Sequence, residues 1–553
     1  MGKVQLNNMS ITVEKESKIL TDVITLVTYY VNKNYTTPDR KKIFEEIDKI
    51  VGFKIAKHNM CNAELTYERM QTILSSINEV GINRKNKGVY YTPHDLVNFI
   101  VINLAKLSCG KLKPNNLHIL DLNGIPYEHF CYQKTVFDPT CGAGEFLLVS
   151  LDIKLDLLEL HHENVTRGKI VKVVDTIYGN DIDENSITIT KIRLLLSILH
   201  RFGVSKISGL AEILNRKFTI IDYVESSSEL RGTFDIIVGN PPYVEDSKSD
   251  LNPPVKYGNI YANVLENSSQ QLNEFGVFGY VIPLSYVSTL RMKKIRDVLD
   301  FRLPEQFILS YSDRPDCLFT AVHQKLNVIF AKKSRTKVCY TSNYQYWYKD
   351  EREKLFEDTS AIKNNFIVPS FIPKLGNKRD SEIFQKVYST VNTITDYYDT
   401  SGKSIYLNMR ATFWIKAFLK EHCGAEYRQL NFNENMVHFM MCMFNSSLFW
   451  WFWVCTSDCW HITNKELSSF RIPTDFNPDE VNRFASILET RLEDTKVYVG
   501  TKQTEYAYKH KDCVDIIHKI DDYMAELYGL TTSENLYIKN FNLRYRLGGG
   551  ADR

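Results

Sequence analysis

The sequence carries almost no net charge. It has 68 Lys and Arg residues against 66 Asp and Glu residues, which leaves a formal charge of +2 over 553 residues. Bulk electrostatics therefore do not indicate a polyanionic partner, and a surface for nucleic acid would have to be a local patch.

Two further features are absent. The 11 Cys residues show no repeated spacing, and the first ten residues, MGKVQLNNMS, contain no apolar leader. Repeated cysteine spacings indicate disulfide frameworks or zinc sites, and an apolar leader indicates secretion. We therefore expect a reducing, intracellular setting of the cytoplasmic type.

One apolar stretch, residues 436–455, has about the length of a membrane-spanning helix. His438 and the sequence Asn445-Ser446-Ser447 interrupt it, and no basic cluster flanks it. Spanning helices carry few polar residues and are oriented by flanking Lys and Arg. We predict a buried helix, a break at the Asn-Ser-Ser sequence and a second buried element, with no membrane partner.

A chain of 553 residues predicts two to four domains. Residues 1–80 have helical periodicity without a glycine-rich loop, whereas residues 81–338 alternate between strand and helix patterns. The predicted strands are residues 134–137, 176–179, 218–221, 234–238, 278–282 and 326–330, and the predicted helices include residues 186–200 and 285–299. This alternation indicates a doubly wound, Rossmann-like α/β sheet.

The character of the sequence changes after residue 338. Residues 339–511 are rich in aromatic and polar side chains with short basic runs, and no second nucleotide-binding pattern appears in them. We predict a separate mixed domain there. Residues 512–553 are expected to form a helical segment that ends in a flexible tail.

A glycine-rich turn follows the first predicted strand of the α/β region. It is the sequence DPTCGAGEFL, residues 138–147, and it leads into a helix. Glycines at such a turn let a bound cofactor approach the backbone closely. We expect cofactor contacts at Asp138, Thr140, Gly142 and Gly144.

Acidic residues follow the next two strands. Asp181 ends the second strand, where doubly wound folds place the acid that binds ribose hydroxyls, and Ile182 is positioned to press on an adenine ring. We expect Asp183 to cap the following helix, although either acid could serve as that cap. Asp222 and Tyr223 follow the third strand, where they suit a contact with the cofactor's adenine amino group.

The fourth strand ends in Asn240-Pro241-Pro242-Tyr243. The prolines make a rigid loop at the carboxyl end of a strand, where open α/β sheets place their sites. An aniline-like amine is a poor nucleophile because its lone pair is delocalised. The Asn240 side-chain oxygen and the Pro241 carbonyl could accept its hydrogens and steady the charge that develops on nitrogen, while Tyr243 could stack on the base.

The order of these motifs resembles the gamma-class DNA N6-adenine methyltransferases, in particular those of type II and type IIG restriction–modification systems. The resemblance also rests on Tyr90-Tyr91-Thr92-Pro93, upstream of the other motifs. It covers residues 80–335 strongly and the C-terminal part loosely. It implies a Rossmann-like class I methyltransferase core, with a helical N-terminal extension and a mixed C-terminal target-recognition domain.

The resemblance further implies S-adenosylmethionine as the cofactor and double-stranded DNA as the partner, with the target adenine flipped out of the duplex. Thr92 would contact the methionine carboxylate of the cofactor, with Tyr91 also in the cofactor site, and Phe319 would pack against the extruded base. Thr92 is also expected to cap the helix that starts at Pro93. A separate restriction endonuclease or specificity subunit is a possible partner of such an enzyme.

A pocket for one adenine does not specify the neighbouring bases, so sequence would be read by other side chains in the DNA grooves. We place that surface beyond residue 340, where aromatic and basic groups occur together. The candidate DNA-binding residues are Tyr344, Tyr346, Lys374, Lys378, Arg379 and Arg410.

Other chemistries need residues that this sequence lacks. Cytosine C5 methylation needs a nucleophilic Cys, commonly after Pro, and no Pro-Cys occurs; Cys455, Cys459 and His461 lack an obvious fourth zinc ligand, so no metal is expected. Residues 1–80 show no nuclease motif. Methylation of RNA or of protein glutamine, and a modification subunit that needs a specificity subunit, remain as alternative functions.

Overall fold

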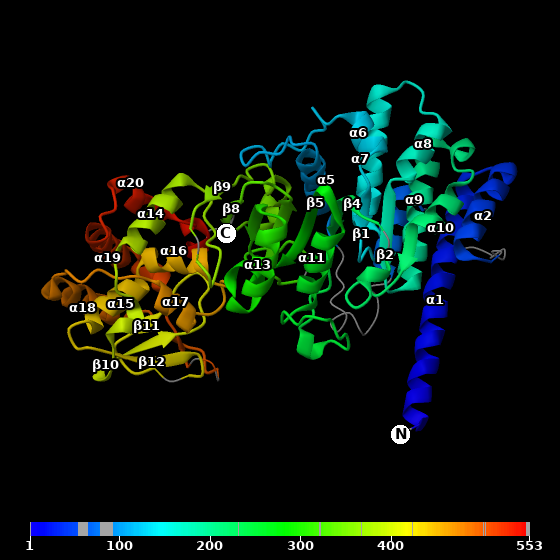
Figure 1. Cartoon of the computed structure of the whole chain (residues 1–553). Coiled ribbons are helices and arrows are strands. Elements are labelled where there is room, and N and C mark those ends of the chain that lie inside the picture. Colours follow the sequence, from blue (N-terminus) through cyan, green and yellow to red (C-terminus); the bar gives the residue numbers. More distant parts are fainter. Residues whose placement is uncertain are drawn as a thin grey trace.

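The computed structural model describes residues 2–53, 65–77, 92–230, 232–319, 322–366, 368–422, 424–501, 503 and 505–548. Three parts follow one another along the chain (Figure 1): helices at one end, a large sheet with covering helices in the middle, and a mixed C-terminal part at the other end. The predicted Tyr91 contact lies outside the described residues.

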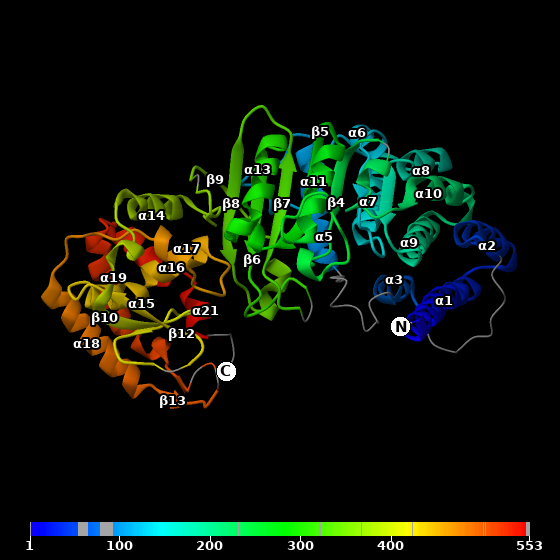
Figure 2. The ribbon, with the colours of Figure 1, turned by 60° about the horizontal axis from the view of Figure 1, so that its bottom comes forward.

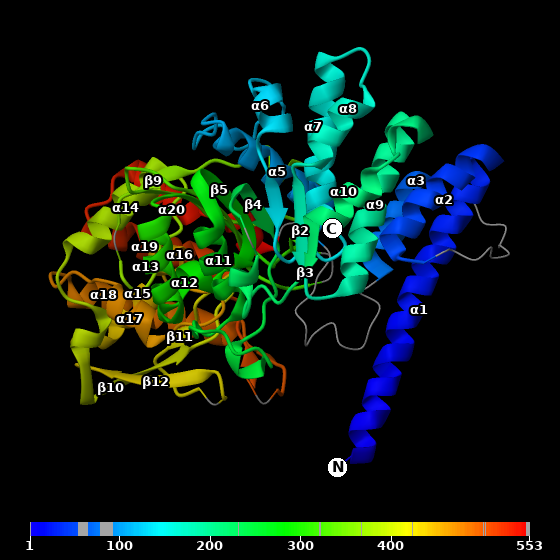
Figure 3. The same cartoon turned by 45° about the vertical axis from the view of Figure 1, so that its right-hand side comes forward.

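The N-terminal part is helical, as the periodicity predicts for residues 1–80. It contains α1 (Gly2–Asn34), α2 (Thr37–Val51) and α3 (Tyr67–Ser76). Figure 3 shows these helices beside α9 (Glu184–Phe202) and α10 (Leu210–Lys217), on the side away from the C-terminal part. Polar contacts fix this packing, because Gln71 exchanges hydrogen bonds with Arg193 and the Glu46 carboxylate accepts the Ala211 N–H at 3.0 Å.

The middle part is a nine-stranded mixed sheet in the order β3-β2-β1-β4-β5-β7-β6-β8-β9. The strands are β1 (Val136–Asp138), β2 (Ile177–Asp181), β3 (Phe218–Ile220), β4 (Phe234–Gly239), β5 (Leu272–Pro283), β6 (Glu305–Tyr311), β7 (Leu326–Lys332), β8 (Val338–Gln345) and β9 (Ile362–Asn364). Neighbours pair in parallel except around β7 and β9, which run antiparallel to their neighbours. The predicted α/β fold is confirmed.

Helices cover both faces of this sheet (Figure 2). The helices of the middle part are α5 (His94–Ser108), α6 (Tyr127–Tyr132), α7 (Glu145–His161), α8 (Arg167–Val174), α9, α10, α11 (Ile260–Gln271), α12 (Ser285–Ser288) and α13 (Lys293–Arg302). Alternate residues of β4 enter different cores: Ile236 and Val238 pack with α5, α7 and α9, whereas Ile237 packs with α11 and α13. The strand therefore reads as a nearly continuous apolar run, as expected for a sheet buried on both faces.

Two details of the middle part differ from the sequence expectations. The predicted helix over residues 285–299 is broken into α12, a short 3-10 turn (Leu290–Met292) and α13, because Thr289 is extended with φ −120° and ψ 143°. Strand β6 was not predicted at all, although it lies buried between β7 and β8.

The C-terminal part combines a small sheet with helices. Its strands are β10 (Tyr398–Asn408), β11 (Ala417–Phe418), β12 (Tyr427–Phe432), β13 (Val497–Tyr498) and β14 (Tyr506–Ala507), and its helices are α14 (Lys378–Ser389), α15 (Val437–Asn445), α16 (Ser447–Thr456), α17 (Asn464–Ser469), α18 (Pro478–Asp494), α19 (Val514–Leu527), α20 (Thr532–Asn540) and α21 (Leu543–Leu547). Helices α15 and α16 are the two buried elements predicted for residues 436–455. Ser446 makes the break and caps α16 by accepting the Phe449 N–H.

Among the residues described, no helix combines the length and the apolar character that a membrane crossing requires.

The predicted boundary between residues 338 and 339 cuts through the large sheet. Strand β8 starts at Val338 and pairs in parallel with β6, and β9 pairs with β8. A division after Asn364 keeps the sheet whole. Helices α19 to α21 are likewise not a separate appendage, because the Arg546 guanidinium lies between the rings of Trp414 and Trp450, 4.0 and 4.4 Å from their centroids.

The junction between β8 and the C-terminal part is tightly packed at Gly376. A Cβ atom on Gly376 would lie 2.4 Å from the Asn343 backbone nitrogen, which cannot swing away. We predict that Gly376→Ala lowers the free energy of unfolding by about 1–3 kcal/mol, the usual range for overpacking. Chemical denaturation of the full chain measures it. Gly168→Ala is the control, because the nearest atom to its Cβ is 4.0 Å away; equal denaturation midpoints for the two variants would contradict this account.

Candidate active site

The glycine-rich loop connects β1 to α7 at the carboxyl edge of the sheet. Gly142 and Gly144 both adopt left-handed conformations, with φ of +52° and +84°. A Cβ on Gly144 would lie 2.5 Å from the Thr190 side chain, whereas a Cβ on Gly142 would meet no atom within 4 Å. The loop is therefore packed from behind at Gly144 and open in front of Gly142, where a ligand can approach the backbone.

Asp181, at the end of β2, holds this loop. Its Oδ2 accepts the Gly142 N–H at 2.8 Å, and its Oδ1 accepts the Asp183 N–H at 3.0 Å. The predicted cap is confirmed at Asp183, whose carboxylate accepts the N–H groups of Asn185 and Ser186 at the start of α9. Ile182 stands between the two acids with 65% of its surface exposed, which leaves it available to a ligand.

Asp138 and Thr140 line the loop from the β1 side. The buried Asp138 carboxylate accepts the Thr140 N–H at 3.0 Å. Burial raises the pKa of Asp138 well above its usual range, with a further contribution from Asp181, and burial also raises the pKa of Asp181. The Thr140 hydroxyl is buried without a hydrogen-bond partner among the described residues. A cationic ligand with polar groups would favour the ionised carboxylates and satisfy this hydroxyl.

The side chain of Asn240, directly after β4, is held at both ends. Its Nδ2 donates to the Thr92 hydroxyl at 3.1 Å, and its Oδ1 accepts from the Tyr243 hydroxyl at 2.5 Å. The Tyr243 hydroxyl also lies 2.9 Å from the Val281 carbonyl oxygen of β5. The side-chain amide of Asn240 therefore has a fixed orientation. It is set by Thr92 before α5, by Tyr243 after β4 and, through Tyr243, by the Val281 carbonyl of β5.

Thr92 differs from its predicted capping role. The N-cap of α5 is Pro93, and no side chain caps that helix end. The buried Thr92 hydroxyl instead meets Asn240, 148 residues away in the chain. A tertiary partner has replaced the local one.

Two residues on α9 that the sequence analysis missed support the glycine loop. The Thr190 hydroxyl donates to the Gly142 carbonyl at 2.8 Å, and Arg193 donates to the Ala143 carbonyl at 2.5 Å. Arg193 also pairs with Glu145 at 2.7 Å. Polar side chains three residues apart on an otherwise apolar helix face were the available signal, because buried polar groups need partners.

The structure bears on three of the predicted cofactor and base contacts. Tyr223 is 3% exposed, and its hydroxyl donates to Gln271 at 2.8 Å, so its side chain belongs to the core and only its backbone stays a candidate for a cofactor contact. Asp222 accepts the N–H groups of Val224 and Glu225 in a tight turn, so a role at the cofactor is an additional one that stays a prediction. Phe319 is 1% exposed, and a contact with a base would require it to move.

The predicted DNA-binding residues divide into buried and exposed groups. Tyr344 and Lys374 are each 2% exposed, and the Lys374 ammonium donates to the Ser457 carbonyl. Both are core residues, so the prediction that they form part of a DNA-binding surface is wrong. Tyr346 is half-buried and stacks near Tyr545.

The other three are exposed. Lys378 and Arg379 begin α14, and Lys378 pairs with Glu382 at 3.2 Å. Arg410 pairs with Glu426 and lies over the Trp460 ring. These three side chains stay candidates for contacts with DNA.

Within the described part of the chain, no group of three or more His, Cys, Asp or Glu side chains is arranged to hold a metal ion. Cys455 and Cys459 are buried, and His461 is exposed.

The segment that carries Asp181 and Asn240 is similar to known proteins. Residues 175–312, from just before β2 to just after β6, match the family model of the Eco57I restriction-modification methylases. The type II restriction enzyme and methyltransferase RM.Eco57I of Escherichia coli is 24% identical over 209 residues, which cover 29% of this chain and 21% of that protein. The methylase subunit of the type I restriction enzyme MjaIX of Methanocaldococcus jannaschii is 25% identical over 194 residues, or 34% of this chain and 25% of the subunit.

Among solved structures, the type IIL restriction–modification enzyme MmeI in complex with DNA aligns with 87% of this chain and 82% of its own, at 12% identity and a TM-score of 0.47. The chain spans less than a third of the length of the two curated relatives named above. The part of the chain that carries Asp181 and Asn240 is thus related to the DNA methyltransferases of restriction–modification systems.

Proposed function

We propose that this protein is a site-specific DNA methyltransferase that transfers a methyl group from S-adenosylmethionine to N6 of adenine in double-stranded DNA. The observation that carries the proposal is the Asn240 amide, fixed by Thr92 and Tyr243 next to an open glycine loop. Strands β1 and β4 are neighbours in the sheet, so the two loops leave it side by side.

The residues around the glycine loop suit S-adenosylmethionine. Asp181 would accept the ribose hydroxyls, because each carboxylate oxygen that now holds one backbone N–H can accept a second bond. Ile182 would lie against the adenine ring, and the unpartnered Thr140 hydroxyl would bind a polar group of the cofactor. When bound, the cofactor supplies an electrophilic methyl group on a positively charged sulfur.

The residues of the Asn240 loop would prepare the target amine. The Asn240 oxygen has two lone pairs, of which Tyr243 uses one, so the other can accept a hydrogen of the adenine amino group. The Pro241 carbonyl would accept the second hydrogen. Together they would draw the nitrogen lone pair out of conjugation and stabilise the positive charge that develops on it, without a covalent intermediate. The methylated nitrogen is acidic and then releases one proton to solvent, so no strong general base is required.

The partners follow from this chemistry. The adenine has to leave the helical stack, at a cost of a few kcal/mol, before its amino group can reach Asn240. Double-stranded DNA is the proposed substrate, and the protein would act where the cell holds its DNA. The similarity to a type I methylase subunit supports a second possibility, that a separate specificity subunit or endonuclease acts with this chain. Methylation of plasmid DNA by the purified chain alone distinguishes an independent enzyme from such a subunit.

Cofactor affinity tests the role of Asp181. Asp181→Ala removes the charge and the support of Gly142, and should weaken S-adenosylmethionine binding by about 2–3 kcal/mol, the scale of hydrogen bonds to a charged group. Asp181→Asn keeps an acceptor and should weaken binding less. Calorimetry measures both. Asp175→Asn, which loses an ion pair to Arg216 far from the loop, is the control; unchanged affinity in folded Asp181→Ala would remove Asp181 from the site.

Turnover tests the role of Asn240. Asn240→Ala removes the proposed acceptor for the amine and should lower single-turnover methylation by roughly a hundredfold or more, the scale of one preorganised transition-state contact. Cofactor affinity should stay at the wild-type value. Methylation near the wild-type rate would show that the reaction proceeds by another route.

Variants of Tyr243 and Thr92 test whether these two residues act by orienting Asn240 or by contacting a ligand directly. Tyr243→Phe keeps the ring but loses the hydroxyl at 2.5 Å from Asn240, and Thr92→Val loses the acceptor at 3.1 Å. Each should lower turnover about two- to tenfold, the value of one net hydrogen bond, with unchanged affinity for cofactor and DNA. Thr92→Ser should restore turnover. A raised cofactor dissociation constant in Thr92→Val would instead assign Thr92 to the cofactor's carboxylate.

A further inference from the structure

The loop between β6 and β7 lies at the edge of the sheet that carries Asn240, and this edge is called the rim below. Tyr311 at the end of β6 pairs with Leu326 at the start of β7, and Leu326 pairs with Pro283 at the end of β5. Because β4 and β5 are parallel, this loop leaves the same edge of the sheet as Asn240. The Leu284 N–H donates to the Lys325 carbonyl at 2.9 Å and ties the loop to that edge.

Three cations from this rim and from the C-terminal part converge on one indole ring. The Arg314 and Lys325 charges of the β6–β7 loop lie 4.9 and 4.3 Å from the centroid of Trp460. Arg410, which follows β10, lies 4.3 Å from the same centroid. Arg314, Lys325, Arg410 and Trp460 are called the Trp460 cluster below. Two parts of the chain that lie far apart in sequence meet in it.

The charges of the cluster are only partly compensated. Arg410 pairs with Glu426 at 3.0 Å and Lys325 with Asp313 at 3.7 Å, whereas no described carboxylate pairs with the Arg314 guanidinium. The three cations are within about 9 Å of one another, which is less than the screening length of ~10 Å at 0.1 M salt. The indole offsets their repulsion by about 0.5–1 kcal/mol for each cation. An external anion would relieve the remainder.

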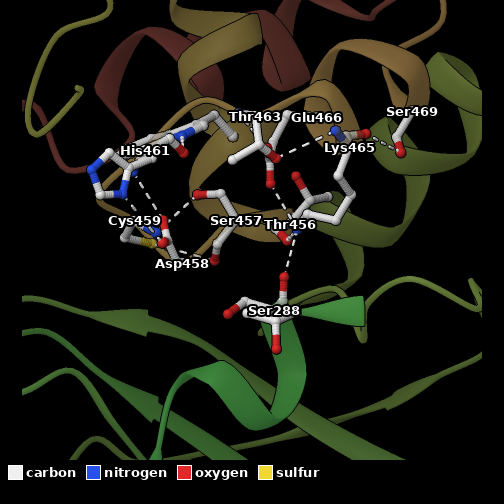
Figure 4. Close-up of polar contacts among 12 residues, drawn as sticks. Ser288, Thr456, Ser457, Asp458, Cys459, His461, Thr463, Lys465, Glu466 and Ser469 are labelled. Atoms are coloured by element: carbon white, nitrogen blue, oxygen red, sulfur yellow. Dashed lines mark hydrogen bonds and ion pairs between the residues drawn. The ribbon is translucent and has the colours of Figure 1, made fainter. Parts of the chain in front are cut away.

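The segment of residues 456–465, which includes Trp460, is joined to the middle part by polar contacts (Figure 4). Lys465 donates to the Ser288 carbonyl of the middle part and to the Thr456 carbonyl of α16, each at 2.7 Å. The Asp458 carboxylate accepts the backbone N–H of Trp460 at 2.9 Å, and the Ala411 backbone N–H donates to the Trp460 carbonyl at 3.1 Å. These bonds hold the backbone of Trp460 against the segment that carries Arg410.

We propose that the Trp460 cluster binds phosphodiester groups of double-stranded DNA next to the nucleotide that enters the pocket. This inference rests on the proposed function. A flipped nucleotide stays joined to the backbone on both sides, so the adjacent phosphates have to pass over the rim. The cluster lies on that rim and also belongs to the C-terminal part. It orients the duplex relative to both parts and carries no information about base sequence.

The salt dependence of DNA affinity tests the proposal. Fluorescence anisotropy measures the DNA affinity of Arg314→Gln, Arg410→Gln and the wild-type chain. The probe is a DNA duplex that contains the target site, which is first identified by sequencing the methylated adenines of cellular DNA. Each lost phosphate contact should reduce the slope of log affinity against log salt by about 0.9 and weaken binding by about tenfold at low salt. Arg216→Gln, on α10 just before the edge strand β3, is the matched control and should behave like the wild type.

Backbone substitution locates the contact. Single neutral methylphosphonates replace the phosphates on either side of the target adenine. The wild-type chain should lose affinity at one or two of these positions, and Arg314→Gln should no longer respond to them. Calorimetry with S-adenosylmethionine confirms that both variants are folded, since their cofactor affinity should be unchanged.

The outcomes separate the two proposals. A wild-type chain that neither binds nor methylates DNA would overturn the proposed function itself. A wild-type chain that binds DNA, with folded Arg314→Gln and Arg410→Gln variants of equal affinity and equal salt slope, would overturn only the role of the Trp460 cluster.

Discussion

The in-register pairing of β1 with β4 is the constraint on which the site depends. Phe137 pairs with Ile237, so the strands end together and their loops start next to each other. The contact is close, because a Cβ on Gly239 would lie 2.8 Å from the Asp138 carboxylate. One loop opens toward the proposed cofactor and the other presents Asn240. A shift of this register by one residue would separate them and turn their side chains to the other face.

Sequence reasoning grouped the candidate site residues because they stand at the ends of apolar strands. Asp138, Asp181 and Asn240 each follow or end a strand of the parallel sheet, and parallel strands bring their carboxyl ends to one edge. Asp183 was predicted as a cap because the rule for helix starts is local. Thr92 obeys the same local rule in sequence, yet its hydroxyl has a tertiary partner that no local pattern records.

The wrong predictions for Lys374 and strand β8 also come from tertiary contacts that no local sequence pattern records. Lys374 was taken as a surface residue from its charge, but its ammonium is hydrogen-bonded to a carbonyl inside the protein. Strand β8 was assigned to another domain because its sequence mixes aromatic and polar residues. In the structure it lies near the edge of the sheet, where Thr341 and Ser342 bury their hydroxyls in hydrogen bonds. Pairing partners, and not composition, decide which strands join a sheet.

The continuous core beneath the C-terminal part bears on how DNA is read. One face of the large sheet shares a single hydrophobic core with α14, α15 and α16, so a chain ending near residue 335 would lose β8 and expose that core. The proposed adenine pocket and the proposed recognition surface therefore rest on one shared hydrophobic core. The most direct measurement is mass spectrometry of nucleosides from DNA incubated with the purified chain and isotopically labelled S-adenosylmethionine. This account predicts label in N6-methyladenine alone, and its disappearance with Asn240→Ala. Label in cytosine, or in N6-methyladenine at an equal rate with Asn240→Ala, would contradict it.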